Sequence, residues 1–164
     1  MRRTVARRDL FVLALVGCLT AARLTRGDEL ARESAVFEAV FRQQIAEHLD
    51  AAERARGTVL CLGIDPGGAP QSPPQAVMAR LSADAALRRI GECDPRPRGA
   101  VEARSLRPAV LVTAGPIEWI AADEAHVAVR YFRSARQSAL RRYRVVRERT
   151  GWVSLGQIIL DGPA

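Results

Sequence analysis

The chain has 164 residues, enough for one ordinary domain that buries roughly two thirds of its unfolded surface. Its formal net charge is +7, and all 25 of its basic residues are arginine. Only two histidines are present, His48 and His126, and no HExxH or GxSxG motif occurs, which excludes most metal-binding and catalytic-triad schemes. We therefore expect no metal and no cofactor, we assign no catalytic residue, and the sequence does not favour an enzyme.

Residues 1–22 have the three parts of an export signal: arginines at the start, an apolar run, and small residues after it. The apolar run is shorter than the ~20 residues that span a bilayer. The segment Leu15-Val16-Gly17-Cys18 resembles the lipobox of bacterial lipoproteins, which implies that Cys18 is acylated and anchors the chain to a membrane. An ordinary signal cut after residue 22, or an uncleaved N-terminus, stays open. Residues 23–27 then form a short linker before a single domain, residues 28–164.

The cysteines support export. Three cysteines are an awkward number for a secreted chain, and acylation of Cys18 would leave Cys61 and Cys93 as a pair. A bridge between them would stabilise the fold by about 3 to 4 kcal/mol in the chain-entropy account. The alternative is two buried free thiols. We expect an exported protein of the cell envelope, periplasmic or extracellular and anchored to a membrane.

The apolar spacing in residues 28–56 predicts a long amphipathic helix, with Asp28 as its N-cap and Gly57 as the residue that ends it. Gln44 and His48 fall near the middle of its apolar face. A buried polar group without a partner costs about 1 to 3 kcal/mol. The pattern therefore predicts either satisfied core residues or a partly hydrated pocket. The apolar face is formed by Val36, Phe37, Val40, Phe41, Ile45 and Leu49.

The middle of the chain predicts one strand and a second helix. Residues 58–64 have the alternation of a buried strand, and residues 65–74 are a loop rich in proline and glycine. Ser72 and Pro73 are typical of a helix start, and the predicted helix continues to about Ile90 with Val77, Leu81 and Leu87 facing inward. Residues 94–99 predict another loop.

From Pro108 to Leu160 the chain predicts an antiparallel meander, because short β-type runs alternate with turn residues. We expect Trp119, Phe132, Tyr143 and Trp152 to pack in the core or in a hairpin. The predicted strands cover residues 109–113, 117–120, 125–132, 140–146 and 152–160.

Helices followed by a run of antiparallel strands indicate the α+β class, with a long N-terminal helix and a second helix on a curved antiparallel sheet of four to six strands. This order resembles the cone-shaped fold of the nuclear transport factor 2-like superfamily. The segment from Tyr143 to Leu155 is similar to the Tyr-x-Val-x-Arg, turn, Gly-x-Trp-x-Val ending of many small exported bacterial proteins with that fold. The resemblance implies a fold and a pocket, but no particular activity.

Two groups of polar residues are candidate sites. If His126 lies on the concave face of the sheet, a pocket could contain Gln44, His48, Glu118, His126 and Arg130; the alternative places His126 on the solvated face. The second group is an arginine-rich stretch that could bind anionic lipid or an acidic polymer, or could be a solvated face with cross-strand ion pairs. Its residues are Arg133, Arg136, Arg141, Arg142, Arg144 and Arg147.

These observations favour a non-catalytic binding or scaffolding role at the cell envelope. The expected partners are a membrane, reached through the lipid anchor, and an anionic surface or an envelope protein. Nucleic acid is not expected, because the aromatic residues are too few for a stacking platform and because the chain is expected to be exported. A small-molecule or enzymatic pocket and an anion-binding surface are the alternatives. The oligomeric state is left open.

Overall fold

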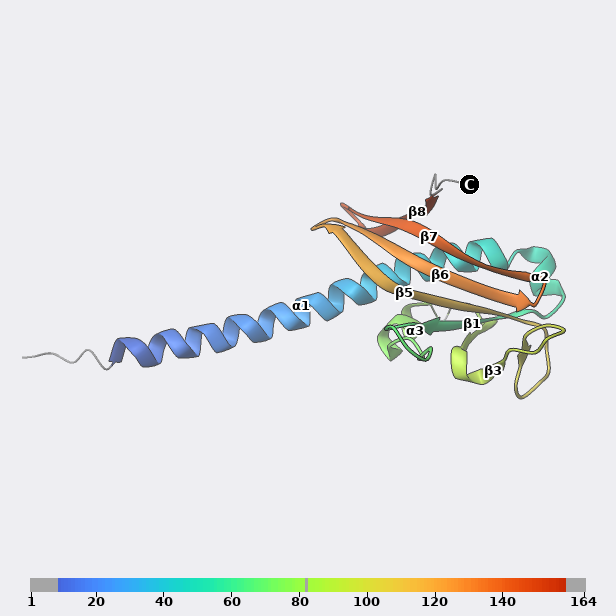
Figure 1. The fold of residues 1–164 in the computed structure, drawn as a ribbon, viewed down its shortest axis with the longest axis horizontal. Helices are drawn as coiled ribbons and strands as arrows, with labels where there is room; N and C mark the ends of the chain where they lie inside the picture. Colours follow the sequence, from blue (N-terminus) through green and yellow to red (C-terminus); the bar gives the residue numbers. More distant parts are fainter. Residues whose placement is uncertain (1–8, 82, 159–164) are drawn as a thin grey trace, which may run out of the picture. The chain divides into compact units, whose positions relative to one another are not determined.

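The computed structural model describes residues 9–81 and 83–158, with side chains from residue 26 onward (Figure 1). The chain divides into two compact units, Met1–Glu33 and Ser34–Ala164. Residues 1–8, with the arginines of the predicted export signal, lie outside the described residues, and so does the side chain of Cys18. All of the strands that are described belong to the second unit.

Helix α1 runs from Asp9 to His48. Within the second unit, its apolar side packs into the core, where Val36, Val40 and Phe41 are completely buried. The predicted apolar face is therefore confirmed. Asp28 lies inside α1, so its assignment as an N-cap is wrong; the alanines, leucines and arginines before it are good helix formers, and the helix continues through them. Among the described residues, no helix has an apolar stretch long enough to cross a membrane.

The predicted helix over residues 28–56 is in fact two helices. After α1 ends, α2 (Ala51–Ala55) begins with Asp50 as its N-cap. The Asp50 carboxylate accepts a 2.7 Å hydrogen bond from the backbone N–H of Glu53, which is the interaction that starts a new helix. Gly57 has a φ of 72° and follows the end of α2, as expected.

Six strands form the main sheet, in the order β2-β1-β5-β6-β7-β8. Strands β5 to β8 follow one another in the chain, and each pairs antiparallel with the next. Strand β1 pairs in parallel with both β2 and β5, which the strand pattern did not predict. The α+β class and a large, mostly antiparallel sheet are confirmed; the curvature of the sheet stays a prediction. The strands are β1 (Val59–Ile64), β2 (Leu87–Arg89), β5 (Ala109–Ala121), β6 (Glu124–Ser134), β7 (Gln137–Glu148) and β8 (Gly151–Ile158).

The second helix is shorter than predicted. Helix α3 covers Gln75–Leu81, and the end of the predicted helix forms strand β2 instead. The Asp84 carboxylate accepts a 3.0 Å hydrogen bond from the backbone N–H of Ala86, and such side-chain bonds to a nearby backbone favour a turn over a helix. Leu87 still faces the core, because β2 pairs with the open edge of β1.

Strand β5 replaces two predicted strands. Its register with β6 shifts between Ala114 and Ile117, where the turn signal Gly115-Pro116 lies. The shift is a local irregularity within one continuous strand. Gly115 has a φ of 125°, and a side-chain carbon there would lie 2.6 Å from the backbone oxygen of Asp65. Glycine is therefore required where the end of β1 approaches β5.

A small second layer covers part of the sheet. It consists of the 3-10 helix η1 (Ile90–Glu92) and the short strands β3 (Cys93–Asp94) and β4 (Val101–Glu102). The expected disulfide joins Cys61 of β1 to Cys93 of β3. The disulfide and the residues around it form an apolar cluster separate from the main core.

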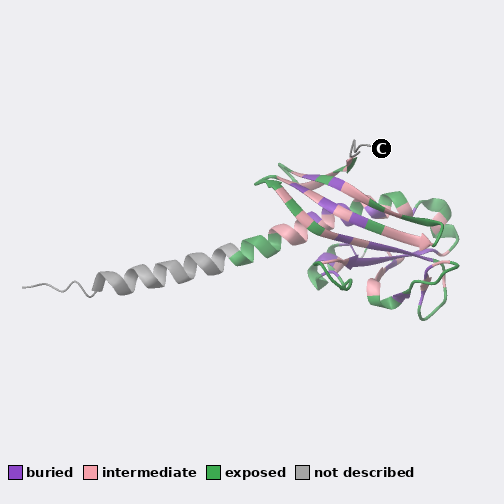
Figure 2. Cartoon of the chain, in the orientation of Figure 1, coloured by how far each residue is buried: buried purple, intermediate pink, exposed green. Residues whose placement is uncertain are grey.

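The two faces of the sheet are covered differently. Alternate side chains of the strands, including Leu62, Val127 and Tyr143, face α1 and α3 in the main core, and we call this side the helix face. The opposite side, the outer face, is covered over β1 and the start of β5 by the small second layer that contains Cys93 of the disulfide. Figure 2 shows buried and more exposed residues alternating along β6 and β7.

The C-terminal hairpin has the geometry expected from its sequence. Trp152, the second residue of β8, pairs with Arg147 of β7. The Trp152 ring meets the Trp119 ring edge to face, with 5.7 Å between ring centres. The two tryptophans therefore pack together beside the main core, as predicted.

Candidate functional site

The sheet separates the five residues of the predicted pocket. Gln44 and His48 belong to α1 on the helix face. Strand register places His126 opposite Glu118 and four residues before Arg130, all on the outer face. The structure therefore does not bring the two histidines into one site.

On the helix face, Gln44 is 1% exposed and finds polar partners. The hydroxyl of Tyr143 donates a 2.8 Å hydrogen bond to Oε2 of Glu47, and Gln44 Nε2 donates to the same oxygen at 3.3 Å. Burial raises the pKa of Tyr143, so the phenol stays protonated and keeps donating. Gln44 is therefore a satisfied core residue that helps to fix α1 on β7.

His48 contacts an aromatic ring on the same face. Its imidazole centre lies 5.0 Å from the ring centre of Tyr131, and the guanidinium carbon of Arg141 lies 5.2 Å from that ring. Burial is the main influence that lowers the pKa of His48, and it favours the neutral imidazole. Arg141 also lies 3.9 Å from Glu47. The C-terminal end of α1 is therefore held to the sheet by the contact of His48 with Tyr131 and by the ion pair of Glu47 with Arg141.

Two ion pairs cross the strands on the outer face. Arg144 donates two hydrogen bonds of 2.9 Å to the two carboxylate oxygens of Glu124, which is the bidentate arrangement. Arg142 lies 3.2 Å from Glu118. His126 Nε2 lies 3.6 Å from Glu124. The hydrogen bond from Arg144 is the main influence that lowers the pKa of Glu124.

Beside these ion pairs, the outer face also carries two exposed leucine side chains. Leu140 of β7 is 65% exposed, and Leu155 of β8 is 53% exposed. Arg130, which pairs with Leu140 across the strands, is exposed and makes no ion pair with any residue in the described ranges. We define the exposed outer face as Glu118, Glu124, His126, Arg130, Leu140, Arg142, Arg144 and Leu155. It carries three arginines and two glutamates, and large apolar groups stand among them.

The arginines of the predicted anion-binding surface lie in several places. Arg133 pairs with Glu53 of α2 at 2.8 Å, and Arg141 lies against Tyr131 on the helix face. Arg142 and Arg144 are the paired residues of the outer face. Arg136 lies in the turn between β6 and β7. Arg147 is exposed near the end of β7, where it pairs with Trp152 across the strands. Because the six side chains belong to different faces, they do not form one continuous surface.

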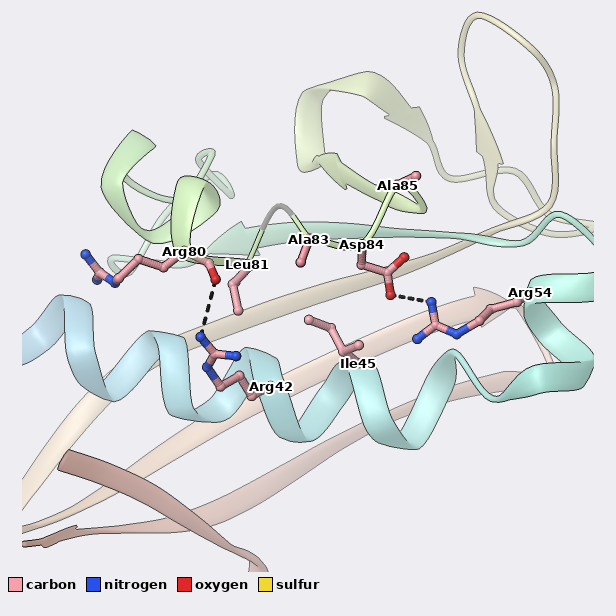
Figure 3. Close-up of a pocket in the computed structure, with 8 residues that line it drawn as sticks. All are labelled: Arg42, Ile45, Arg54, Arg80, Leu81, Ala83, Asp84 and Ala85. Atoms are coloured by element: carbon pink, nitrogen blue, oxygen red, sulfur yellow. Dashed lines mark hydrogen bonds and ion pairs between the residues drawn. The ribbon is translucent and has the colours of Figure 1, made fainter. Parts of the chain in front are cut away.

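A depression of about 430 Å³ lies between α1, α2 and the segment that follows α3 (Figure 3). The Arg42 side chain donates to the backbone oxygen of Arg80 at 3.3 Å, and Arg54 pairs with Asp84. Ile45 stands between these two contacts in Figure 3.

The charges around this depression are largely matched. Burial opposes ionisation of Glu38, but hydrogen bonds from Arg42 and Arg80 outweigh it and lower the pKa of Glu38. Burial likewise opposes ionisation of Asp84, and its hydrogen bonds from Arg54 and from the Ala86 backbone again lower the pKa. The contacts join α3 and the following segment to α1 and α2, which is a structural role.

Comparisons of this chain with family models, with curated proteins and with solved structures found no match.

Proposed function

We propose that this chain is an exported protein, tethered to a membrane through an acylated Cys18, with a non-catalytic binding role in the cell envelope. Export is supported by the disulfide between Cys61 and Cys93, since such bonds persist in oxidising compartments. The exposed outer face is the proposed binding surface. The nuclear transport factor 2-like fold, with a curved sheet, remains part of the proposal.

The observation that carries this proposal is the exposure of Leu140 and Leu155 on a sheet whose other face packs against α1 and α3 in the main core. Large aliphatic groups surrounded by polar ones are typical of protein interaction sites, and arginine is enriched in interfaces. The exposed outer face carries one more arginine than it has glutamates. We therefore propose a protein partner with an apolar centre and an acidic rim.

This assignment is favoured over the two alternatives. A pocket built on Gln44 and His48 is less well supported, because Gln44 is bound to Glu47 and stands beside Tyr143. Binding of a flat anionic surface is less well supported because the arginines of residues 133–147 lie on different faces. The outer face instead combines apolar area with a moderate positive charge.

Site-specific photo-cross-linking in native membranes tests the binding face. A photoreactive residue replaces Leu140 or Leu155 in the full chain, and Leu106 is the matched control because its side chain is 59% exposed and apolar but lies in the β4–β5 connection. We expect both outer-face positions to form the same discrete protein adduct, and the control position to form none. Adducts at all three positions, or at none, would refute the proposed face. Adducts with lipid alone would favour the anionic-surface alternative.

Intact mass tests the tether separately. We expect protein extracted from its own membranes to have the mass of residues 18–164 plus acyl groups on Cys18. Without reduction, its other two cysteines should not react with an alkylating reagent. A full-length, unmodified chain would contradict both the anchor and the export signal.

A further inference from the structure

The second unit contains a polar cavity that lies apart from the exposed outer face. Its volume is about 310 Å³, within the range of small-molecule sites, ~300 to 1,000 Å³. Several segments that are distant in sequence meet around it: α2 and the link to β1, the loop before β4, the start of β5, and the turn between β6 and β7. Such convergence of segments at one end of a sheet resembles the way in which binding sites are assembled from loops on a rigid scaffold.

Three guanidinium groups line this cavity against one carboxylate. They belong to Arg56, Arg98 and Arg133, and the carboxylate is Glu53. The lining therefore carries an excess of two positive charges, whereas the depression of Figure 3 has three arginines near two carboxylates. An anion that entered this cavity would be attracted by the unbalanced charge.

Glu53 binds two of these guanidinium groups and so holds them in place in the absence of a ligand. Its Oε1 accepts from Arg133 at 2.8 Å and from Arg56 at 2.5 Å, and its Oε2 accepts from the Thr58 hydroxyl at 2.7 Å. The hydrogen bond from Arg133 is the main influence that lowers the pKa of Glu53, so the carboxylate stays charged. Both arginines use only NH1 in these contacts, and each keeps other N–H groups for an oxyanion.

Three other polar side chains of the cavity have no polar partner among the described residues. Within the described ranges, Arg98 makes no ion pair, and the side chains of Ser134 and Gln137 make no hydrogen bond. A guanidinium binds a carboxylate or a phosphate with a bidentate fork. A hydroxyl and a carboxamide each donate and accept, so they recognise alcohol groups. The other lining residues are Gly99, Ala100, Pro108 and Ala109.

We propose that this cavity binds an anionic sugar, a polyhydroxylated ligand that carries a carboxylate or a phosphate group. The three arginines hold the anionic group, and Ser134 and Gln137 hold hydroxyl groups of the sugar. The inference does not depend on the outer face or on the partner proposed for it.

Calorimetric titration of the full chain in a neutral detergent tests the site. The probes are glucose 6-phosphate, glucuronate, glucose and inorganic phosphate. We expect saturable binding of one or both charged sugars, and the pair distinguishes a phosphate from a carboxylate specificity. Glucose should not bind measurably, because it lacks the anionic group. Absence of saturable binding of both charged sugars, or equal binding of glucose, would overturn the proposal.

Variants locate the binding. Arg98→Gln should weaken binding of the charged sugar by about tenfold, the effect of one charge-assisted hydrogen bond. It should not unfold the chain, because Arg98 has no ion-pair partner among the described residues. Arg104→Gln is the matched control: it removes the same charge from an exposed position in a neighbouring loop that does not line the cavity. Equal weakening by both variants would show non-specific attraction and overturn the site.

Gln137→Ala tests recognition of the sugar itself. We expect it to weaken the charged sugar severalfold while binding of inorganic phosphate is unchanged. If the charged sugar and inorganic phosphate bind equally well, and Gln137→Ala weakens neither, the assignment to a sugar is wrong.

Discussion

The hydroxyl of Tyr143 donates a 2.8 Å hydrogen bond to Glu47, so a side chain at the centre of β7 is bound directly to α1. Tyr143 is 1% exposed, and its ring belongs to the main core. The bond joins the helix face to the helix that covers it, and its removal should be measurable as a loss of stability.

We expect Tyr143→Phe to lower the free energy of unfolding by about 1 to 2 kcal/mol, because a hydrogen bond to a charged group is lost while the ring remains. Urea denaturation followed by circular dichroism measures the change. Tyr131→Phe is the control, since the Tyr131 hydroxyl has no hydrogen bond within the described residues. Equal losses for the two variants would show that the bond to Glu47 contributes little.

Glu102 should make stability fall at acid pH. Glu102 is 6% exposed, and its carboxylate accepts hydrogen bonds from Ser105, Arg88 and Arg107, which lower its pKa from 4.5 to about 2. Because the folded-state pKa lies below the unfolded one, this contribution is complete above pH 4.5 and is lost as the pH falls toward 2. Denaturation midpoints measured across this pH range should show the decrease.

Glu102→Gln should reduce the slope of stability against pH in that range and lower the stability at pH 7 by about 1 to 3 kcal/mol, because Arg88 and Arg107 lose their charged partner. Glu148→Gln removes an exposed carboxylate without a described partner and serves as the control. An unchanged slope in the Glu102 variant would assign the acid sensitivity to other carboxylates.

The disulfide should contribute substantially to stability. Cys61 and Cys93 are 32 residues apart, and the chain-entropy account gives about 3 to 4 kcal/mol for a loop of this length. We expect the double variant Cys61→Ala, Cys93→Ala to lose about that amount in chemical denaturation. Reduction of the native protein should cause a similar loss, while the double variant should be insensitive to reductant. A native protein whose midpoint does not respond to reductant would contradict the prediction.

Ser154→Ala should stabilise the protein. The Ser154 hydroxyl oxygen is buried, and no hydrogen-bond partner for it exists among the described residues. Removing an unpaired buried hydroxyl recovers part of its desolvation cost, so we expect a gain of about 1 kcal/mol. Thermal denaturation measures it, with the exposed Ser138→Ala as control. A clear loss of stability would indicate that Ser154 has a partner outside the described residues.

The elements that the sequence predicts best are those with a strong local period. The apolar face of α1 follows from side chains repeating at helical spacing, and the hairpin of Tyr143 and Trp152 follows from strand alternation and a glycine turn. Strand β2 was missed because three residues carry no period of their own. Its conformation is decided by the open edge of β1, a partner distant in sequence.

The sites show the same limit. Alternation along β6 predicts that His126 and Arg130 share a face, but it does not say which face α1 covers. The arginines were grouped by closeness in the chain, whereas the polar cavity takes Arg56 and Arg98 from outside that stretch. The available signal was the proline-rich loop that contains Arg98, because a loop with several guanidiniums must place them on the surface.

The parallel pairing of β1 with β5 determines when the sheet can form. Val59 has its partner at Ala109, so β1 gains that neighbour only after the long segment between them has been brought into place. Closing so long a segment costs entropy before any strand contact compensates for it. A chain that emerges from an export channel N-terminus first would therefore hold Leu60 and Leu62 unburied until β5 arrives. Any fragment that ends before Ala109 would lack the strand against which its own apolar residues pack, so the part of the chain before β5 is not a separable folding unit.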